Sequence, residues 1–251
     1  MEKKILLIFL CPAILIAGKL TNEEMEHFIT STTYMDSGER TNLRKQLLEK
    51  KLYLINPHWY REPAWKSMDL QEIDQETRDF LRKVASWHKQ LTGIDNEIYF
   101  DDEISLEEVR ERCYRGEDSD TTGYMSVLFV KKAGMKKICG SEWPYGYGRY
   151  SYSTGEAYIN VEKCATRERM FDVILEETTQ LYGPIGDTKV HSNSIFWTGG
   201  GTSTEIPEID RKIINAMYQP EVKQGMYEEE LRVVVPKAGY SDEAVFGGVF
   251  A

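Results

Sequence analysis

Residues 166–187 read TRERMFDVILEETTQLYGPIGD, and the interpretation of the whole chain starts from this stretch. The spacing of Met170, Ile174 and Leu181 predicts an amphipathic helix whose apolar stripe faces a core. Glu177 falls on the same stripe. A carboxylate in that position is partly removed from water, so it needs a cation or hydrogen-bond donors.

Polar groups gather near the C-terminal end of this predicted helix. Glu176 and Gln180 are four residues apart, so their side chains lie one turn apart on one face. Gly183 ends the helix, and Asp187 follows after a further glycine turn. Two adjacent carboxylates, an amide and a third carboxylate therefore converge. The alternative is an ordinary capped helix with solvated glutamates.

Length and composition limit what the protein can be. With 251 residues, of which 41% are hydrophobic and 29% charged, the chain suits one globular domain of moderate size plus extensions. The formal net charge is -10, and no stripe of Lys and Arg is visible. This charge argues against nucleic acid as a partner.

The N-terminus has the form of a targeting signal. Residues 1–18 begin with a short charged start and continue as a nearly unbroken apolar run that ends in small residues. We therefore expect an extracytoplasmic protein, either periplasmic or secreted. The alternative is an uncleaved signal anchor, which would be the only contact with a membrane. An exported chain can form disulfides, but Cys113, Cys139 and Cys164 allow at most one bridge within the chain.

The order of predicted elements indicates an α+β fold with a mixed sheet packed on helices. Residues 19–68 are expected to be a linker and N-terminal extension, in which residues 19–37 are a linker or a frayed helix and residues 40–51 a short charged helix. Residues 69–226 are expected to form the domain, and 227–251 a tail with a short Val-rich strand. The expected elements of the domain are helices at 80–91, 105–113, 166–183 and 205–218 and strands at 98–100, 125–132 and 156–161.

Residues 143–152, WPYGYGRYSY, are rich in glycine and tyrosine. They predict a hairpin or loop whose aromatic rings pack on the domain. The alternative is a rim that faces a substrate, because tyrosine offers contact area at a low entropy cost. In that case Tyr145 and Tyr147 would bind the substrate.

The assembled pattern resembles a known class of enzyme. The helix carries E-E-x-x-Q-x-x-G, a turn with an aspartate and the sequence S-I-F at 194–196 follow, and a later helix ends at Met217-Tyr218. This order resembles the catalytic half of metzincin-type zinc peptidases. It resembles more closely a bacterial family of exported proteins of unknown function with E-E-x-x-Q-x-x-G-x-x-x-D followed by S-x-F. The resemblance implies a zincin (metzincin)-like fold with the motif-bearing helix at its centre.

The resemblance also implies roles for individual residues. Glu176 stands where the first zinc-binding histidine would be, and Glu177 stands where the general base would be. Gln180 takes the place of the second histidine. Either Gly186 or Asp187 takes the place of the third ligand. On this basis Glu177 is the candidate catalytic residue, and Glu176, Gln180 and Asp187 are the candidate metal ligands.

This sequence departs from the peptidase pattern in ways that affect its chemistry. Phe196 replaces the methionine of the turn. Gln180 is a poor zinc ligand because a neutral amide oxygen donates weakly. A divalent metal at these positions would be zinc or an ion that prefers oxygen ligands, such as calcium, magnesium or manganese. His191 is either a replacement ligand or an exposed loop residue.

Three hypotheses follow for function. In the first, a metzincin-like domain with a degenerate zinc site, non-proteolytic or weakly active, binds peptide or cell-envelope material in the former active-site cleft. In the second, a working hydrolase uses a carboxylate and amide metal site with Glu177 as its base. In the third, the motif is accidental and the chain is an unrelated α+β binding or scaffolding module. The first is favoured because replacing two histidine ligands together should cost most of the zinc affinity.

Overall fold

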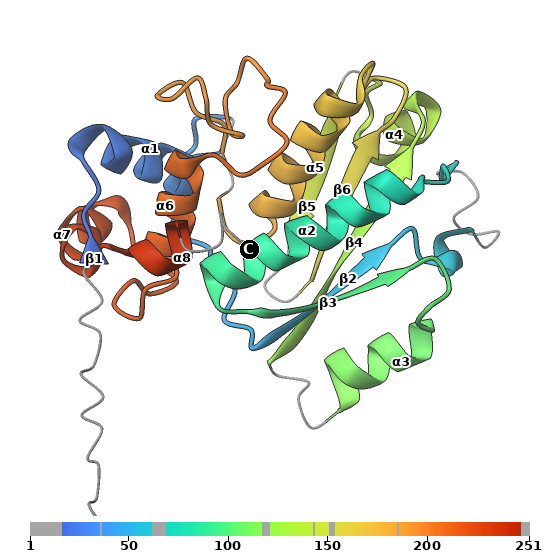
Figure 1. Ribbon diagram of the computed structural model, residues 1–251, viewed down its shortest axis with the longest axis horizontal. Coiled ribbons are helices and arrows are strands. Elements are labelled where there is room, and N and C mark those ends of the chain that lie inside the picture. The colour runs from blue at the N-terminus through green and yellow to red at the C-terminus, as the bar shows by residue number, and fades with distance from the viewer. Residues whose placement is uncertain are drawn as a thin grey trace, which may run out of the picture.

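The computed structural model describes residues 17–35, 37–61, 69–116, 121–142, 144–150, 154–184 and 186–246. Its centre is a five-stranded sheet with the strand order β3-β2-β4-β6-β5, flanked by helices (Figure 1). The strands are β2 (Lys50–Ile55), β3 (Asp95–Phe100), β4 (Thr122–Val130), β5 (Gly146–Tyr150) and β6 (Thr154–Asn160). The first four in this order pair in parallel, and β5 pairs antiparallel with β6 at the edge. The predicted mixed sheet packed on helices is confirmed as a mixed α/β architecture.

Helices form two groups around this sheet. The helices are α1 (Asn22–Thr33), α2 (Gln75–Thr92), α3 (Leu106–Arg110), α4 (Lys132–Cys139), α5 (Arg167–Gln180), α6 (Glu208–Met217), α7 (Glu228–Ala238) and α8 (Asp242–Phe246). Short turns of helix also occur at His58–Arg61 and Glu111–Arg115. Helices α2 and α5 pack on one face of the sheet. In Figure 1, α1, α6, α7 and α8 gather beside this layer as a separate helical group.

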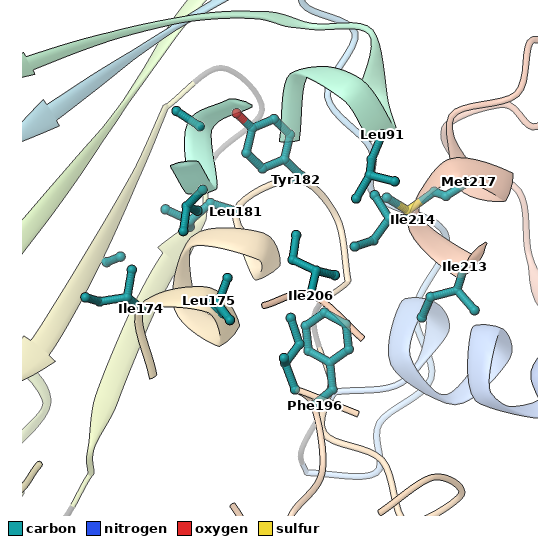
Figure 2. Packing of buried hydrophobic residues seen from close by; sticks show 14 of the residues in the cluster. Leu91, Ile174, Leu175, Leu181, Tyr182, Phe196, Ile206, Ile213, Ile214 and Met217 are labelled. Atoms are coloured by element: carbon teal, nitrogen blue, oxygen red, sulfur yellow. The ribbon is translucent and has the colours of Figure 1, made fainter. Parts of the chain in front are cut away.

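The two faces of the sheet carry separate cores. The larger core joins the face under α2 and α5 to α1, α6 and α7. Figure 2 shows Phe196 and Ile206 between Leu175 of α5 and Ile213 of α6, so this core ties the helical group to the motif-bearing helix. The smaller core lies on the opposite face with α3 and α4. A sheet with both faces covered explains why β4 is almost entirely apolar and buried.

The helix predicted from residues 166–183 is confirmed. The hydroxyl of Thr166 accepts the backbone N–H of Arg169 and caps the start of α5, which ends at Gln180. Val173, Ile174 and Leu175 are fully buried in the larger core. This helix lies beside β5 and β6, and the sheet therefore fixes which residues of α5 face the edge strand.

Of the two alternatives for residues 19–37, a linker or a frayed helix, the structure shows a helix. Residues 22–33 form α1, which is capped by Thr21 and buries Phe28 and Ile29, and Lys50–Ile55 forms β2 in the middle of the sheet. The predicted charged helix at 40–51 was wrong, because residues 41–49 are irregular. The two lysines at its end, Lys50 and Lys51, are instead the first residues of β2, whose remaining residues 52–55 are apolar and buried.

The predicted Val-rich strand in the tail was also wrong. Val233, Val234 and Val235 lie inside α7. Three glutamates, Glu228–Glu230, occupy the first turn of this helix, where negative side chains favour the helix dipole. Val235 is then buried in the larger core. The glutamates at the start of the helix and the burial of Val235 favour a helix here, although valine on its own prefers strands.

The predicted targeting signal lies almost wholly outside the described residues, since residues 1–16 are not described. Its last two residues form β1 (Ala17–Gly18), which pairs antiparallel with β7 (Tyr240–Ser241). Among the described helices, none has the length and apolar character needed to cross a membrane. Cys113, Cys139 and Cys164 are free thiols in this structure.

Candidate functional site

A pocket of about 380 Å³ lies between α5, the edge strand β5 and two loop segments (compare α5 and β5 in Figure 1). It is lined by all the residues that the sequence singled out as site residues: Tyr145, Tyr147, Glu176, Glu177, Gln180 and Asp187. The other lining residues are Pro144, Gly146, Gly148, Arg169, Trp197, Thr198, Gly199 and Gly200. The structure thus brings the predicted residues together. Their roles in binding or catalysis stay predictions.

Glu177 sits at the junction of α5 and β5, where only 7% of its surface is exposed. A Cβ atom placed on Gly146 would lie 2.3 Å from Oε1 of Glu177, and one placed on Gly148 would lie 3.2 Å from Oε2. A side chain at Gly146 would therefore displace the carboxylate. The glycines in this stretch of β5 allow α5 to bring its buried carboxylate against the strand backbone.

Glu176 is in an environment that disfavours its charge. Burial and the neighbouring carboxylates of Glu177, Asp187 and Asp172 raise its pKa well above the ordinary value, and Arg169 only partly offsets them. The pocket therefore concentrates negative charge around the last turns of α5. A ligand that brings positive charge or hydrogen-bond donors would relieve this repulsion.

Arg169 also lines the pocket, two turns before Glu176 on the same helix. Its guanidinium pairs with Asp172, donates to the carbonyl of Gly201 at 2.9 Å, and lies 4.3 Å from the ring centroid of Tyr145. Asp172 also accepts the backbone N–H groups of Gly201 and Ser203. Burial still raises the pKa of Asp172 above its ordinary value. These contacts hold the glycine loop 199–201 against α5.

The wall that carries Asp187 and Trp197 is fixed by a buried polar network. The backbone N–H of Thr188 donates to the carbonyl of Phe196 at 2.7 Å, which joins the segment after α5 to the S-I-F turn. Asp210 of α6 accepts the hydroxyl of Ser194 at 2.7 Å and the N–H of Ile195 at 2.8 Å. The turn predicted from the resemblance is therefore held by the helix that follows it.

Helix α1 completes this network from the other side. Nε2 of His27 lies 2.9 Å from Oδ1 of Asp210, and Nδ1 lies 3.4 Å from the hydroxyl of Thr188. His27 and Asp210 are both fully buried. His191 makes an edge contact with His27 at 5.1 Å and lies 3.7 Å from Glu23, and it does not line the pocket. The pocket wall thus depends on a helix that precedes the sheet.

The C-terminal end of α5 is anchored by buried polar groups as well. Nζ of Lys51 donates to the carbonyl of Leu181 at 2.8 Å, and burial lowers the pKa of this lysine well below its ordinary value. Nε2 of His88 lies 2.8 Å from the hydroxyl of Thr179, and burial lowers the pKa of His88 to about 3. These contacts fix the last turn of the helix, so Gln180 faces the pocket from a rigid support.

The two tyrosines differ in what they present to the pocket. The ring of Tyr145 lies under two cations, with Arg169 at 4.3 Å and Lys163 at 5.2 Å from its centroid. The ring of Tyr147 packs against Tyr158 of the smaller core, with 6.4 Å between centroids. Both line the pocket, but the ring of Tyr147 is held against the neighbouring strand.

The donor set does not fit a catalytic zinc ion. The described lining residues include no histidine or cysteine. Across the described part of the chain, no group of three or more His, Cys, Asp or Glu side chains is arranged to hold a metal ion. A zinc hydrolase needs three good ligands and an open position. Glu176, Gln180 and Asp187 share the pocket, but they do not supply that arrangement.

The comparisons with known proteins give one family. The sequence profile of a family described as "Protein of unknown function (DUF2927)" matches residues 65–237. The chain belongs to this family. A search of curated proteins found no match. The DUF2927 match contains every residue that lines the pocket, whereas α1 and β2 lie before it.

Arg169 and Trp197 are among the residues of the DUF2927 pocket that were not predicted from the sequence. Arg169 lies seven residues before Glu176, a spacing of two helical turns that places both on one face. This spacing was available from the sequence. Trp197 gave no such signal, because it follows the turn at 194–196 and only the folding of that turn onto Asp210 brings it to the pocket.

Proposed function

We propose that this DUF2927 protein is an extracytoplasmic, peptide-binding domain built on a metzincin-like scaffold that no longer uses zinc. The observation that carries the proposal is the pocket between α5 and β5, which gathers Glu176, Glu177, Gln180 and Asp187 beside an edge strand. Pockets with a few convergent polar groups are the usual places for ligand binding.

The order of the secondary-structure elements along the chain supports the proposed metzincin-like scaffold. The motif-bearing helix α5 follows β6 and lies next to the antiparallel strand β5. The S-I-F turn comes next and is tied by Asp210 to α6, and Phe196 is fully buried between α5 and α6 (Figure 2). A buried apolar side chain at this place can support the pocket floor whether it is phenylalanine or methionine.

The backbone geometry of the edge strand β5 favours an extended peptide as the ligand. Within the described residues, β5 pairs with β6 alone. The carbonyl of Tyr145 accepts the N–H of Asn160 across this pair. Because antiparallel residues alternate between bonding inward and outward, the backbone groups of Gly146 and Gly148 point away from β6. A peptide can add to such an edge through main-chain hydrogen bonds.

Fluorescein-labelled casein, an unfolded polypeptide, provides one assay for binding and cleavage. Fluorescence anisotropy reports binding, and gel electrophoresis of the same samples reports cleavage. We expect a saturable rise in anisotropy with the casein intact. No binding would overturn the proposal. Cleavage that a chelator abolishes and a metal ion restores would replace it with the hydrolase hypothesis.

A matched pair of variants tests the edge strand. Gly148→Pro removes the outward N–H, and Gly148→Ala keeps it while adding a Cβ at the same place. We expect casein binding to be lost in Gly148→Pro and largely kept in Gly148→Ala, with circular dichroism showing that both variants fold. Equal binding by the two folded variants would contradict strand addition at β5.

A further inference from the structure

The edge strand β5 turns alternate residues to opposite faces of the sheet. Cβ atoms on Gly146 and Gly148 would point at Glu177 of α5, so these two positions face the motif helix. Tyr147 and Arg149 alternate with them and face the other way, where the ring of Tyr147 packs on the smaller core. An extended peptide added to β5 alternates in the same manner, because neighbouring residues of adjacent strands share a face. Every second side chain of the peptide therefore lies on the face of Arg149.

The guanidinium of Arg149 lies on that face, and 52% of this side chain is exposed. One of its five N–H groups donates to the carbonyl of Ile138 at 2.9 Å. Arg149 is opposite Glu156 in the strand pair, but its Nη1 lies 4.0 Å from Oε2 of that carboxylate, beyond hydrogen-bond distance. The two oxygens of Glu156 accept the hydroxyls of Tyr60 and Tyr158, at 2.6 Å and 2.7 Å. The guanidinium therefore retains donors that a second carboxylate can accept.

The segment that ends at Arg149 is basic, although the whole chain is acidic. Residues 131–149 contain four lysines and one arginine against a single glutamate, in a chain whose formal net charge is -10. Lys136 and Lys137 lie in the last turn of α4, next to the Ile138 carbonyl that Arg149 binds. Both lysines are exposed. This side of the edge strand is therefore complementary to a negative group brought by a ligand.

We propose that the polypeptide bound at β5 places an acidic side chain, of glutamate or aspartate, beside Arg149. The two side chains then form a cross-strand pair of opposite charge. Because the N–H and C=O of Arg149 point toward β6, as the carbonyl of Tyr145 does, this pair is of the non-hydrogen-bonded kind, in which side chains approach most closely. The proposal rests on the proposed peptide binding at β5 and adds the class of side chain that is recognised.

Two fluorescein-labelled heptapeptides test this pairing: Thr-Val-Thr-Glu-Thr-Val-Thr and the same peptide with glutamine in place of glutamate. Threonine and valine favour an extended strand, and glutamine keeps the shape of glutamate without its charge. We expect the glutamate peptide to bind about threefold more tightly in fluorescence anisotropy at low salt, a typical gain from a cross-strand charge pair. Arg149→Gln should abolish this preference, and Arg149→Lys should keep part of it.

Arg82→Gln is the matched control for the change of charge. It removes the same charge from an arginine of α2 that lies 4.8 Å from the ring centroid of Phe100 in β3, at the other edge of the sheet. The glutamate preference should survive in this variant, with circular dichroism showing that all variants fold. Loss of the preference in both Arg149→Gln and Arg82→Gln, or a preference that Arg149→Gln leaves unchanged, would overturn the inference.

Labelled casein separates this inference from the proposed function. If casein binds but the two peptides bind equally, or neither peptide binds, the inference is overturned and polypeptide binding stands. If neither casein nor the peptides bind, both are overturned.

Discussion

Glu176 is the residue whose environment says most about the pocket. Neutralising a solvent-facing glutamate on a helix usually does not stabilise the folded state. Glu176 differs, because it is crowded by Glu177 and Asp187 and is partly removed from water. A protein that keeps such a carboxylate gives up stability at neutral pH. Residues that disfavour the folded state in this way cluster at functional sites.

The raised pKa of Glu176 predicts a specific pH dependence. Because the folded-state pKa lies above the unfolded value of about 4.5, the folded state binds more protons in that window and stability falls as pH rises through it. Glu176→Gln should therefore raise Tm at pH 7.5 by about 2 °C or more, with little gain at pH 4. Thermal unfolding by circular dichroism measures this. Glu168→Gln is the control, and an equal gain in both variants would contradict the local cause.

Alanine substitutions at Gly146 and Gly148 should destabilise the protein to different extents. Gly146→Ala places a Cβ 2.3 Å from the Glu177 carboxylate and should cost about 1–3 kcal/mol, whereas Gly148→Ala meets the same carboxylate at 3.2 Å and should cost less. Urea unfolding measures both. Equal stability of the two variants would mean that Glu177 does not lie against β5 as described.

At the scale of elements, helix α1 determines the pocket as much as the motif helix does. The His27 and Asp210 side chains join α1 to α6, and Asp210 holds the turn that leads to Trp197. Gly186 also donates its N–H to the carbonyl of Ser31 at 3.2 Å. The loop after α5 is therefore clamped between two helices that are distant in sequence.

Removing Asp210 should loosen this clamp. Asp210→Ala leaves the buried donors of Ser194 and Ile195 without their acceptor, so we expect a loss of about 2–4 kcal/mol in urea unfolding. Glu208→Ala, two residues before Asp210 in the first turn of the same helix, removes an ion pair between the exposed Glu208 and Lys212 and should cost less than about 1 kcal/mol. Similar losses in both variants would argue against a special role for the network.

At the scale of the whole molecule, the sequence was informative where local patterns decide structure. The motif helix follows directly from the spacing of its apolar residues. The convergence of Glu176, Glu177, Gln180 and Asp187 on one pocket was also predictable, because the first three lie in the last turns of α5 and Asp187 follows in the next turn.

Other features could not be read from local patterns. Strand β2 begins with Lys50 and Lys51, and the burial of Lys51 makes sense only once α5 supplies the carbonyl of Leu181. The role of α1 depends on His27 meeting a residue that lies 183 positions later. Contacts of this range are set by the assembled core, so composition alone left a linker and a frayed helix as alternatives there.

The central claim is that the pocket binds polypeptide without a metal. The most direct measurement is the anisotropy of labelled casein with the purified full chain, before and after exhaustive treatment with EDTA. The claim predicts the same affinity in both samples. A loss of binding after EDTA that added zinc or manganese restores would contradict it.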